Sequence, residues 1–198
     1  LNLPLIFFNK NFRGKGEVGI EGTFNGGAIE LTVDPTHISY ESKEVSLEPQ
    51  FKEGEKAPNC IFFYDFNEGF WRGKIPLKGV KLKEHSFGIE FDSFTSEVDL
   101  EGSEFLFQNV DATSNYVHFD AEAILDFSHD HHADLKIHTY GIQGEAPSVI
   151  TFLNHFEMFR DVHLPLKGKM VSGPGEMRLH AKIGEVKELL EWKISLKL

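Results

Sequence analysis

Residues 117–127 read VHFDAEAILDF, a stretch in which apolar and polar side chains alternate almost from end to end. Its odd-numbered positions are all apolar: Val117, Phe119, Ala121, Ala123, Leu125 and Phe127. Because successive side chains of a β-strand point to opposite sides, this pattern predicts a sheet with one apolar face and one polar face. The same two-residue period recurs through most of the chain from Glu17 to Leu198.

Turn-forming residues separate the alternating stretches at intervals of about ten residues, which is typical of an antiparallel meander. Asn25-Gly26-Gly27, between Val18–Phe24 and Ile29–Val33, predicts a hairpin because tight turns need a positive φ. The run Ala133–Ile137 is expected to pair with residues 117–127 across a turn at His129–His132. Further strands are predicted at Ile61–Phe66, Trp71–Leu82, Phe87–Phe91, Val98–Leu100, Phe105–Phe107, Met177–Ile183 and Trp192–Leu198.

The period changes between Ser148 and Asp161, where apolar residues follow helical spacing. We therefore expect one helix near residues 148–161, with Ser148 after Pro147 as its N-cap. Such a helix would cover an open end of the sheet, where a strand would leave an unpaired edge. Glu185–Glu191 predicts a further helical turn.

Composition narrows the classes of function. The chain has 198 residues and a net charge of −11, which argues against nucleic acid or an anionic membrane surface as a partner. Cys60 is the single cysteine, so no internal disulfide can form. No apolar run reaches the roughly 20 residues of a membrane-spanning helix. Because the chain begins at Leu1 rather than Met, we expect residues 1–198 to be a single β-rich segment of a longer protein.

A short element recurs at Leu3-Pro4-Leu5, Ile75-Pro76-Leu77-Lys78-Gly79 and Leu164-Pro165-Leu166-Lys167-Gly168. Each copy is expected to open a block of strands, so that blocks start near residues 3, 75 and 164. The last copy stands between a helical stretch, Pro147–Leu153, and an alternating one, Gly175–Ile183. This order of helix, Leu-Pro-Leu strand and glycine-punctuated strands resembles the repeat unit of the AsmA-like proteins, which include the TamB group.

The resemblance implies an all-β fold: a long antiparallel meander curled into an open trough, or β-taco, with an apolar concave face and one capping helix. It also implies a non-enzymatic segment of a bridge-like protein that moves phospholipids between membranes in outer membrane biogenesis. Such a segment would lie in the periplasm, anchored to a membrane through other parts of the protein, with a partner protein in the outer or inner membrane. Acyl chains suit an apolar trough because each buried CH₂ contributes about 0.8 kcal/mol without a directional partner.

The lipid-binding groove is predicted from the apolar positions of the central strands. These are Ile75, Leu77, Phe87, Ile89, Phe91, Phe105, Phe107, Val117, Phe119, Leu125, Phe127, Leu135 and Ile137. The same residues are compatible with a closed core, because a Phe-rich sheet can also pack against a second sheet. A β-sandwich or jelly-roll module that binds protein or glycan is therefore the alternative. A third hypothesis is a small lipocalin-like barrel with one compact cavity.

No catalytic motif stands out, and we expect neither an enzyme nor a cofactor. Cys60 has no catalytic signature around it, and no serine lies in a Gly-x-Ser-x-Gly turn. His129, His131 and His132 gather in one predicted turn, with His118 and His138 on flanking strands. His129 and His131 would project to the same side of an extended segment and could hold zinc or copper. Because unpaired histidines commonly gather in polar turns without binding a metal, no metal site is expected there.

Overall fold

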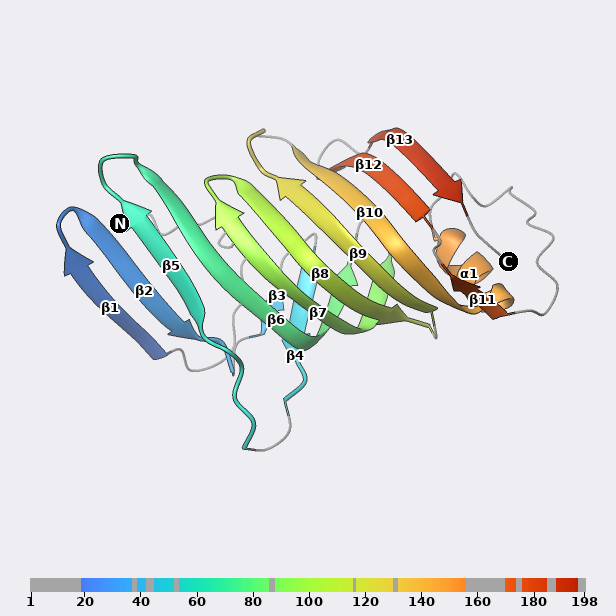
Figure 1. The fold of residues 1–198 in the computed structure, drawn as a ribbon, viewed down its shortest axis with the longest axis horizontal. Helices are drawn as coiled ribbons and strands as arrows, with labels where there is room; N and C mark the ends of the chain where they lie inside the picture. The colour runs from blue at the N-terminus through green and yellow to red at the C-terminus, as the bar shows by residue number, and fades with distance from the viewer. Residues whose placement is uncertain are drawn as a thin grey trace.

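In the computed structural model, all the described strands belong to one antiparallel, thirteen-stranded sheet (Figure 1). The structure describes residues 19–36, 39–41, 45–51, 54–85, 88–115, 117–129, 132–155, 170–173, 176–184 and 188–195. The strands are β1 (Gly19–Asn25), β2 (Ala28–Asp34), β3 (Tyr40–Glu41), β4 (Val45–Pro49), β5 (Cys60–Asp65), β6 (Phe70–Glu84), β7 (Ile89–Glu101), β8 (Glu104–Ser114), β9 (Val117–Asp126), β10 (His132–Glu145), β11 (Met170–Gly173), β12 (Glu176–Gly184) and β13 (Glu188–Ser195). The predicted all-β meander is thus confirmed.

The strand order along the sheet is β1-β2-β5-β6-β7-β8-β9-β10-β12-β13, so β1 and β13 form two edges and the sheet is open. Strand β4 joins the side of β6 and carries β3, while β11 joins the end of β10. The first hairpin turns at Gly26 and Gly27, whose positive φ angles of 60° and 95° fit the predicted tight turn.

The pairing register shifts at neighbouring points on the long central strands. The shifts lie between Leu77 and Val80 on β6, Thr95 and Glu97 on β7, Phe107 and Val110 on β8, and Thr139 and Gly141 on β10. We call this line of bulges the crease. Bulges bend their strands, so the crease curves the sheet into an open trough, and β3 and β4 lie behind the long strands in Figure 1.

The crease also changes which residues point to the apolar face. On β8, Phe105 and Phe107 belong to the apolar face before the crease, and Val110 and Ala112 belong to it afterwards. An inserted residue shifts the alternation by one position, so the apolar positions change from odd to even. Asn109, at the bulge itself, has a positive φ of 49°.

Pro76 lies in the middle of β6 instead of opening a strand as predicted. Strand β6 pairs with β5 through Phe70–Lys74 and with β4 through Val80–Glu84. Residues 75–79 therefore have no strand partner on that side among the described residues. Pro76 lacks a backbone N–H and cannot donate a hydrogen bond to a neighbouring strand. A proline therefore destabilises the sheet least at a position where no strand lies alongside. The other two Leu-Pro-Leu copies lie outside the described residues.

Helix α1 (Ala146–Leu153) follows β10 directly and packs against the apolar face. The helix begins two residues earlier than predicted. Its N-cap is Glu145, which makes no side-chain capping bond, so the predicted N-cap at Ser148 is wrong. Pro147 falls in the first turn, where a missing N–H costs nothing. The helix also ends earlier than predicted, at Leu153 with Asn154 as its C-cap. Residues 156–161 of the predicted segment lie outside the described part of the chain.

Two further predictions are corrected by the structure. Strand β7 runs without a break from Ile89 to Glu101, where separate strands at Phe87–Phe91 and Val98–Leu100 were expected. Glu188–Glu191, expected to form a helical turn, belongs to β13. Among the described residues, no helix is long and apolar enough to cross a membrane.

Candidate functional site

One row of cross-strand neighbours crosses the apolar face from β2 to β12. Each residue pairs with the next: Leu31, Phe62, Gly73, Leu100, Phe105, Leu125, Leu135 and Ala181. A second row runs beside it through Ile75, Val98, Phe107, Ala123, Ile137 and Leu179. Cross-strand pairs of this kind pack side by side, so the two rows form a continuous apolar surface.

Six of the predicted groove residues stand in these two rows: Ile75, Phe105, Phe107, Leu125, Leu135 and Ile137. Phe87 is outside the described residues, and Phe127 follows the end of β9, where its ring meets Phe105 at 5.7 Å. Every other predicted groove residue belongs to one of three hydrophobic clusters. The sheet register therefore brings together residues that are far apart in the sequence.

Exposure divides the predicted groove into two parts. Ile89, Phe105, Val117 and Phe119 are buried under their neighbours and form core. The other predicted groove residues in these clusters are partly exposed, so a ligand could contact them. We call six of these the apolar stripe: Ile75, Leu77, Phe107, Leu125, Leu135 and Ile137.

The buried hydroxyl groups on the apolar face are satisfied by the backbone. Ser96 Oγ donates a hydrogen bond to the carbonyl of Gln108 at 2.9 Å. Thr139 Oγ1 accepts a hydrogen bond from the backbone N–H of Met177 at 2.8 Å. Because these hydroxyls already have hydrogen-bond partners inside the protein, they do not make the apolar face polar.

Cys60 lies on β5 and is buried. Its burial, together with the nearby charge of Asp34, raises the pKa of the thiol to about 11. Nucleophilic chemistry requires the thiolate, which this environment disfavours at neutral pH. The structure thus favours a packing role for Cys60.

The opposite side of the sheet, the polar face, carries charged side chains and histidines. A depression of about 620 Å³ lies on it, lined by the polar residues Gln108, Glu122, Lys136, His138, Arg178 and His180 and also by apolar residues, Leu106 and Ile124 among them. His138 lies between two carboxylates, with Nδ1 3.4 Å from Glu122 and Nε2 3.5 Å from Glu176. This face therefore offers ionic contacts where the other offers hydrocarbon.

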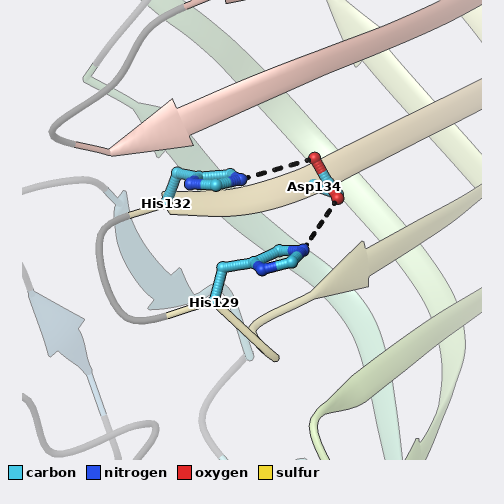
Figure 2. Close-up of side chains that lie close together, drawn as sticks. All are labelled: His129, His132 and Asp134. Carbon is cyan, nitrogen blue, oxygen red and sulfur yellow. Dashed lines mark ion pairs between the residues drawn. The ribbon is translucent and has the colours of Figure 1, made fainter.

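A cluster of histidines surrounds Asp134 at the edge of the polar face (Figure 2). His129 Nε2 lies 3.5 Å from one carboxylate oxygen, and His132 Nε2 lies 3.9 Å from the other. The two imidazole rings stack with centroids 4.6 Å apart and an angle of 13° between their planes. His131, which the sequence analysis placed on the same side as His129, lies outside the described residues.

Sequence reasoning missed Asp134 and His180 as members of this cluster. His180 belongs to β12, and its Nε2 lies 3.9 Å from Asp134 Oδ1. The two residues come together because Asp134 pairs with Lys182, the polar-face neighbour of His180 on the same strand. Only the register of β10 against β12, which the sequence did not specify, reveals this contact.

A second group of potential ligands, Asp111, His118 and Asp120, lies elsewhere on the polar face. His118 Nδ1 is 3.8 Å from Asp111, and His118 Nε2 is 3.5 Å from Asp120. The side chains of Asp111 and Asp120 are 63% and 52% exposed, so water reaches these carboxylates. Asp134 differs from these two residues, because its side chain is only 23% exposed.

Comparisons with models of protein families, with curated proteins and with solved structures find no match for this chain. The similarity to the AsmA-like repeat therefore stays a prediction from the residues themselves.

Proposed function

We propose that the chain shelters the acyl chains of phospholipids on its apolar face, as a non-enzymatic segment of a bridge-like protein that moves lipids between membranes. The observation that carries the proposal is the continuous row of apolar positions from Leu31 on β2 to Leu135 on β10, in which Leu100 and Phe105 are buried and Leu31, Phe62, Leu125 and Leu135 are partly exposed. Lipid movement along this row would break and form no covalent bonds, because the acyl chains would slide over the row while the headgroups stay in water.

The length of the row supports a path along which lipids move. Six steps separate β2 from β10 in the order β2-β5-β6-β7-β8-β9-β10. At about 4.8 Å for each step, the row spans roughly 29 Å. The acyl chains of one leaflet span only about half of a hydrocarbon core of roughly 30 Å. The row is therefore about twice as long as one acyl chain, which suits a lipid that moves from strand to strand.

The apolar stripe supplies the contact surface. Leu125 and Ile137 are partly exposed, and they lie in the two neighbouring rows on β9 and β10. Each CH₂ that leaves water against such a surface contributes about 0.8 kcal/mol. On this proposal the chain works in the periplasm, and partner proteins in the outer or inner membrane supply and accept the lipid.

One observation weighs against the sandwich alternative. A sandwich buries its apolar face against a second sheet. All the described strands instead belong to one sheet, and partly exposed apolar side chains remain on its apolar face.

Native mass spectrometry of the purified chain tests the proposal directly. We expect co-purified phospholipid, detected as adducts whose masses match two-chain lipids. A lipid-stripped sample should then take up a fluorescent fatty acid. If the chain carries no amphiphile and takes up no fatty acid, the proposal is wrong.

A matched pair of variants locates the binding surface. Leu125→Asp places a charge in the apolar stripe, whereas Ile124→Asp places it one residue away on the polar face. We expect at least about tenfold weaker fatty-acid binding by Leu125→Asp, because burying a charge among acyl chains costs well over 1.4 kcal/mol. Ile124→Asp should bind like the unchanged chain. Equal binding by both variants would remove the apolar stripe from the site.

A further inference from the structure

The environment of Asp134 is built from three separate segments. His129 follows β9, His132 and Asp134 belong to β10, and His180 belongs to β12. All three imidazoles direct Nε2 at the same carboxylate, at 3.5, 3.9 and 3.9 Å. Side chains from three segments thus converge on one point of the polar face.

These distances do not fit direct hydrogen bonds, which run from about 2.7 to 3.2 Å between nitrogen and oxygen. They fit a shared ion better. In a tetrahedral site with metal–nitrogen and metal–oxygen bonds of about 2.0–2.2 Å, neighbouring ligand atoms lie roughly 3.4 Å apart. Ligand atoms of His129, His132 and Asp134 lie within 4.8 Å of one another, and His180 Nε2 approaches the same carboxylate at 3.9 Å, close to the spacing of co-ligands of one ion.

Two atoms of the cluster are buried without a partner. Asp134 Oδ1 and His180 Nε2 are shielded from water, and neither has a hydrogen-bond partner among the described residues. A buried carboxylate oxygen without a partner is costly. Lys182, the cross-strand partner of Asp134, does not resolve this cost, because its ammonium binds Glu188 at 2.9 Å. An ion between Asp134 and His180 would satisfy both atoms at once.

The chemistry of the four side chains selects the class of ion. Imidazole suits zinc, copper and nickel, whereas calcium and magnesium prefer oxygen ligands. Three imidazoles and one carboxylate also complete the four-coordinate shell typical of structural zinc. Histidines bind metals in their neutral form. His180 lines the depression on the polar face, which offers the ion a route of entry.

We propose that His129, His132, His180 and Asp134 bind one zinc-class divalent ion, which fastens the segment after β9 to strands β10 and β12. The site lies on the polar face, opposite the apolar stripe. The proposal is therefore independent of the proposed lipid function.

Titration of the purified, metal-free chain with Zn²⁺ in competition with a chromophoric chelator tests the site. We expect one tightly bound ion for each chain and a higher melting temperature with zinc. His180→Ala should weaken the affinity by at least about tenfold, which is the smallest loss typical when even an outer-shell partner of a metal is removed. Co²⁺ should give the intense visible absorption of a tetrahedral site with the unchanged chain and lose it with this variant.

His118→Ala is the matched control, because it removes a histidine that also lies between carboxylates on the polar face. This variant should keep the zinc affinity, the cobalt spectrum and the zinc-dependent rise in melting temperature. The proposal is overturned if the unchanged chain binds no zinc, or if His118→Ala loses as much affinity as His180→Ala. Melting of the two metal-free variants at the temperature of the metal-free unchanged chain would show that each folds.

Discussion

Phe119 on β9 and Phe152 on α1 pack with their ring centroids 4.4 Å apart, and both side chains are almost fully buried. Phe91 on β7 approaches each of these rings at 6.4 Å. The three rings join the helix to two strands that are not neighbours in the sheet. Because α1 has only eight residues and no side-chain N-cap, its stability depends on this packing more than on its own backbone.

Phe152→Ala should therefore destabilise the protein strongly. Removing a buried phenylalanine costs about 3–5 kcal/mol, through lost burial and the cavity left behind. Urea denaturation measures this loss as a lower free energy of unfolding. Thr151→Ala, at an exposed position of the same helix, should cost far less. Similar losses from both variants would mean that Phe152 does not anchor α1.

Much of the fold could be predicted from the sequence because alternation is a local signal. The run Ala133–Ile137 pairs with residues 117–127 as expected, and the structure places Leu135 opposite Leu125 and Ile137 opposite Ala123. The crease could not be predicted in the same way. A bulge depends on how two strands fit together, so the continuous β7 looked like two short strands.

The candidate sites differ in how far the sequence reveals them. The apolar stripe follows from side-chain period, which the sequence displays directly. The ligand set around Asp134 depends on the pairing of β10 with β12, strands separated by helix α1. In the sequence, the signal for this ligand set was the group of histidines at His129–His132. That group indicated His131 as a ligand and indicated neither Asp134 nor His180.

Thr139→Val should lower stability although it preserves the shape of the side chain. The Thr139 hydroxyl accepts the N–H of Met177 beside the crease, and both residues are buried. Valine would leave that N–H without its side-chain acceptor, which costs about 1–3 kcal/mol. Thr139→Ser keeps the acceptor and should lose less. Urea denaturation of the two variants checks this order, and the reverse order would contradict it.

Substitutions of Asn109 test whether the crease needs a residue that adopts the left-handed backbone conformation. Its φ of 49° lies in a region that β-branched residues avoid and glycine adopts freely. Asn109→Val should destabilise the protein by about 1–2 kcal/mol, whereas Asn109→Gly should be tolerated. Thermal melting compares the two variants. A valine variant as stable as the glycine variant would show that the bulge can form without a positive φ at this position.

The thiol of Cys60 should react slowly until the chain unfolds. Burial, with the charge of Asp34, raises its pKa from 9.0 to about 11. At pH 8 the folded chain then holds about a hundredfold less thiolate than the unfolded chain, and thiolate is the species that iodoacetamide attacks. Mass spectrometry of the alkylated chain, with and without urea, measures both rates. Equal rates in the two states would contradict the burial of Cys60.

The same shift predicts how stability depends on pH. Below pH 9 the thiol is protonated in both states, so Cys60 adds no pH dependence there. Between about pH 9 and 11 the unfolded chain releases the proton while the folded chain retains it. Because the folded state then binds more protons, the free energy of unfolding must fall as the pH rises through this range. Urea denaturation at several pH values should show a steeper fall for the unchanged chain than for Cys60→Ala. Parallel curves would mean that the thiol has the same pKa in both states.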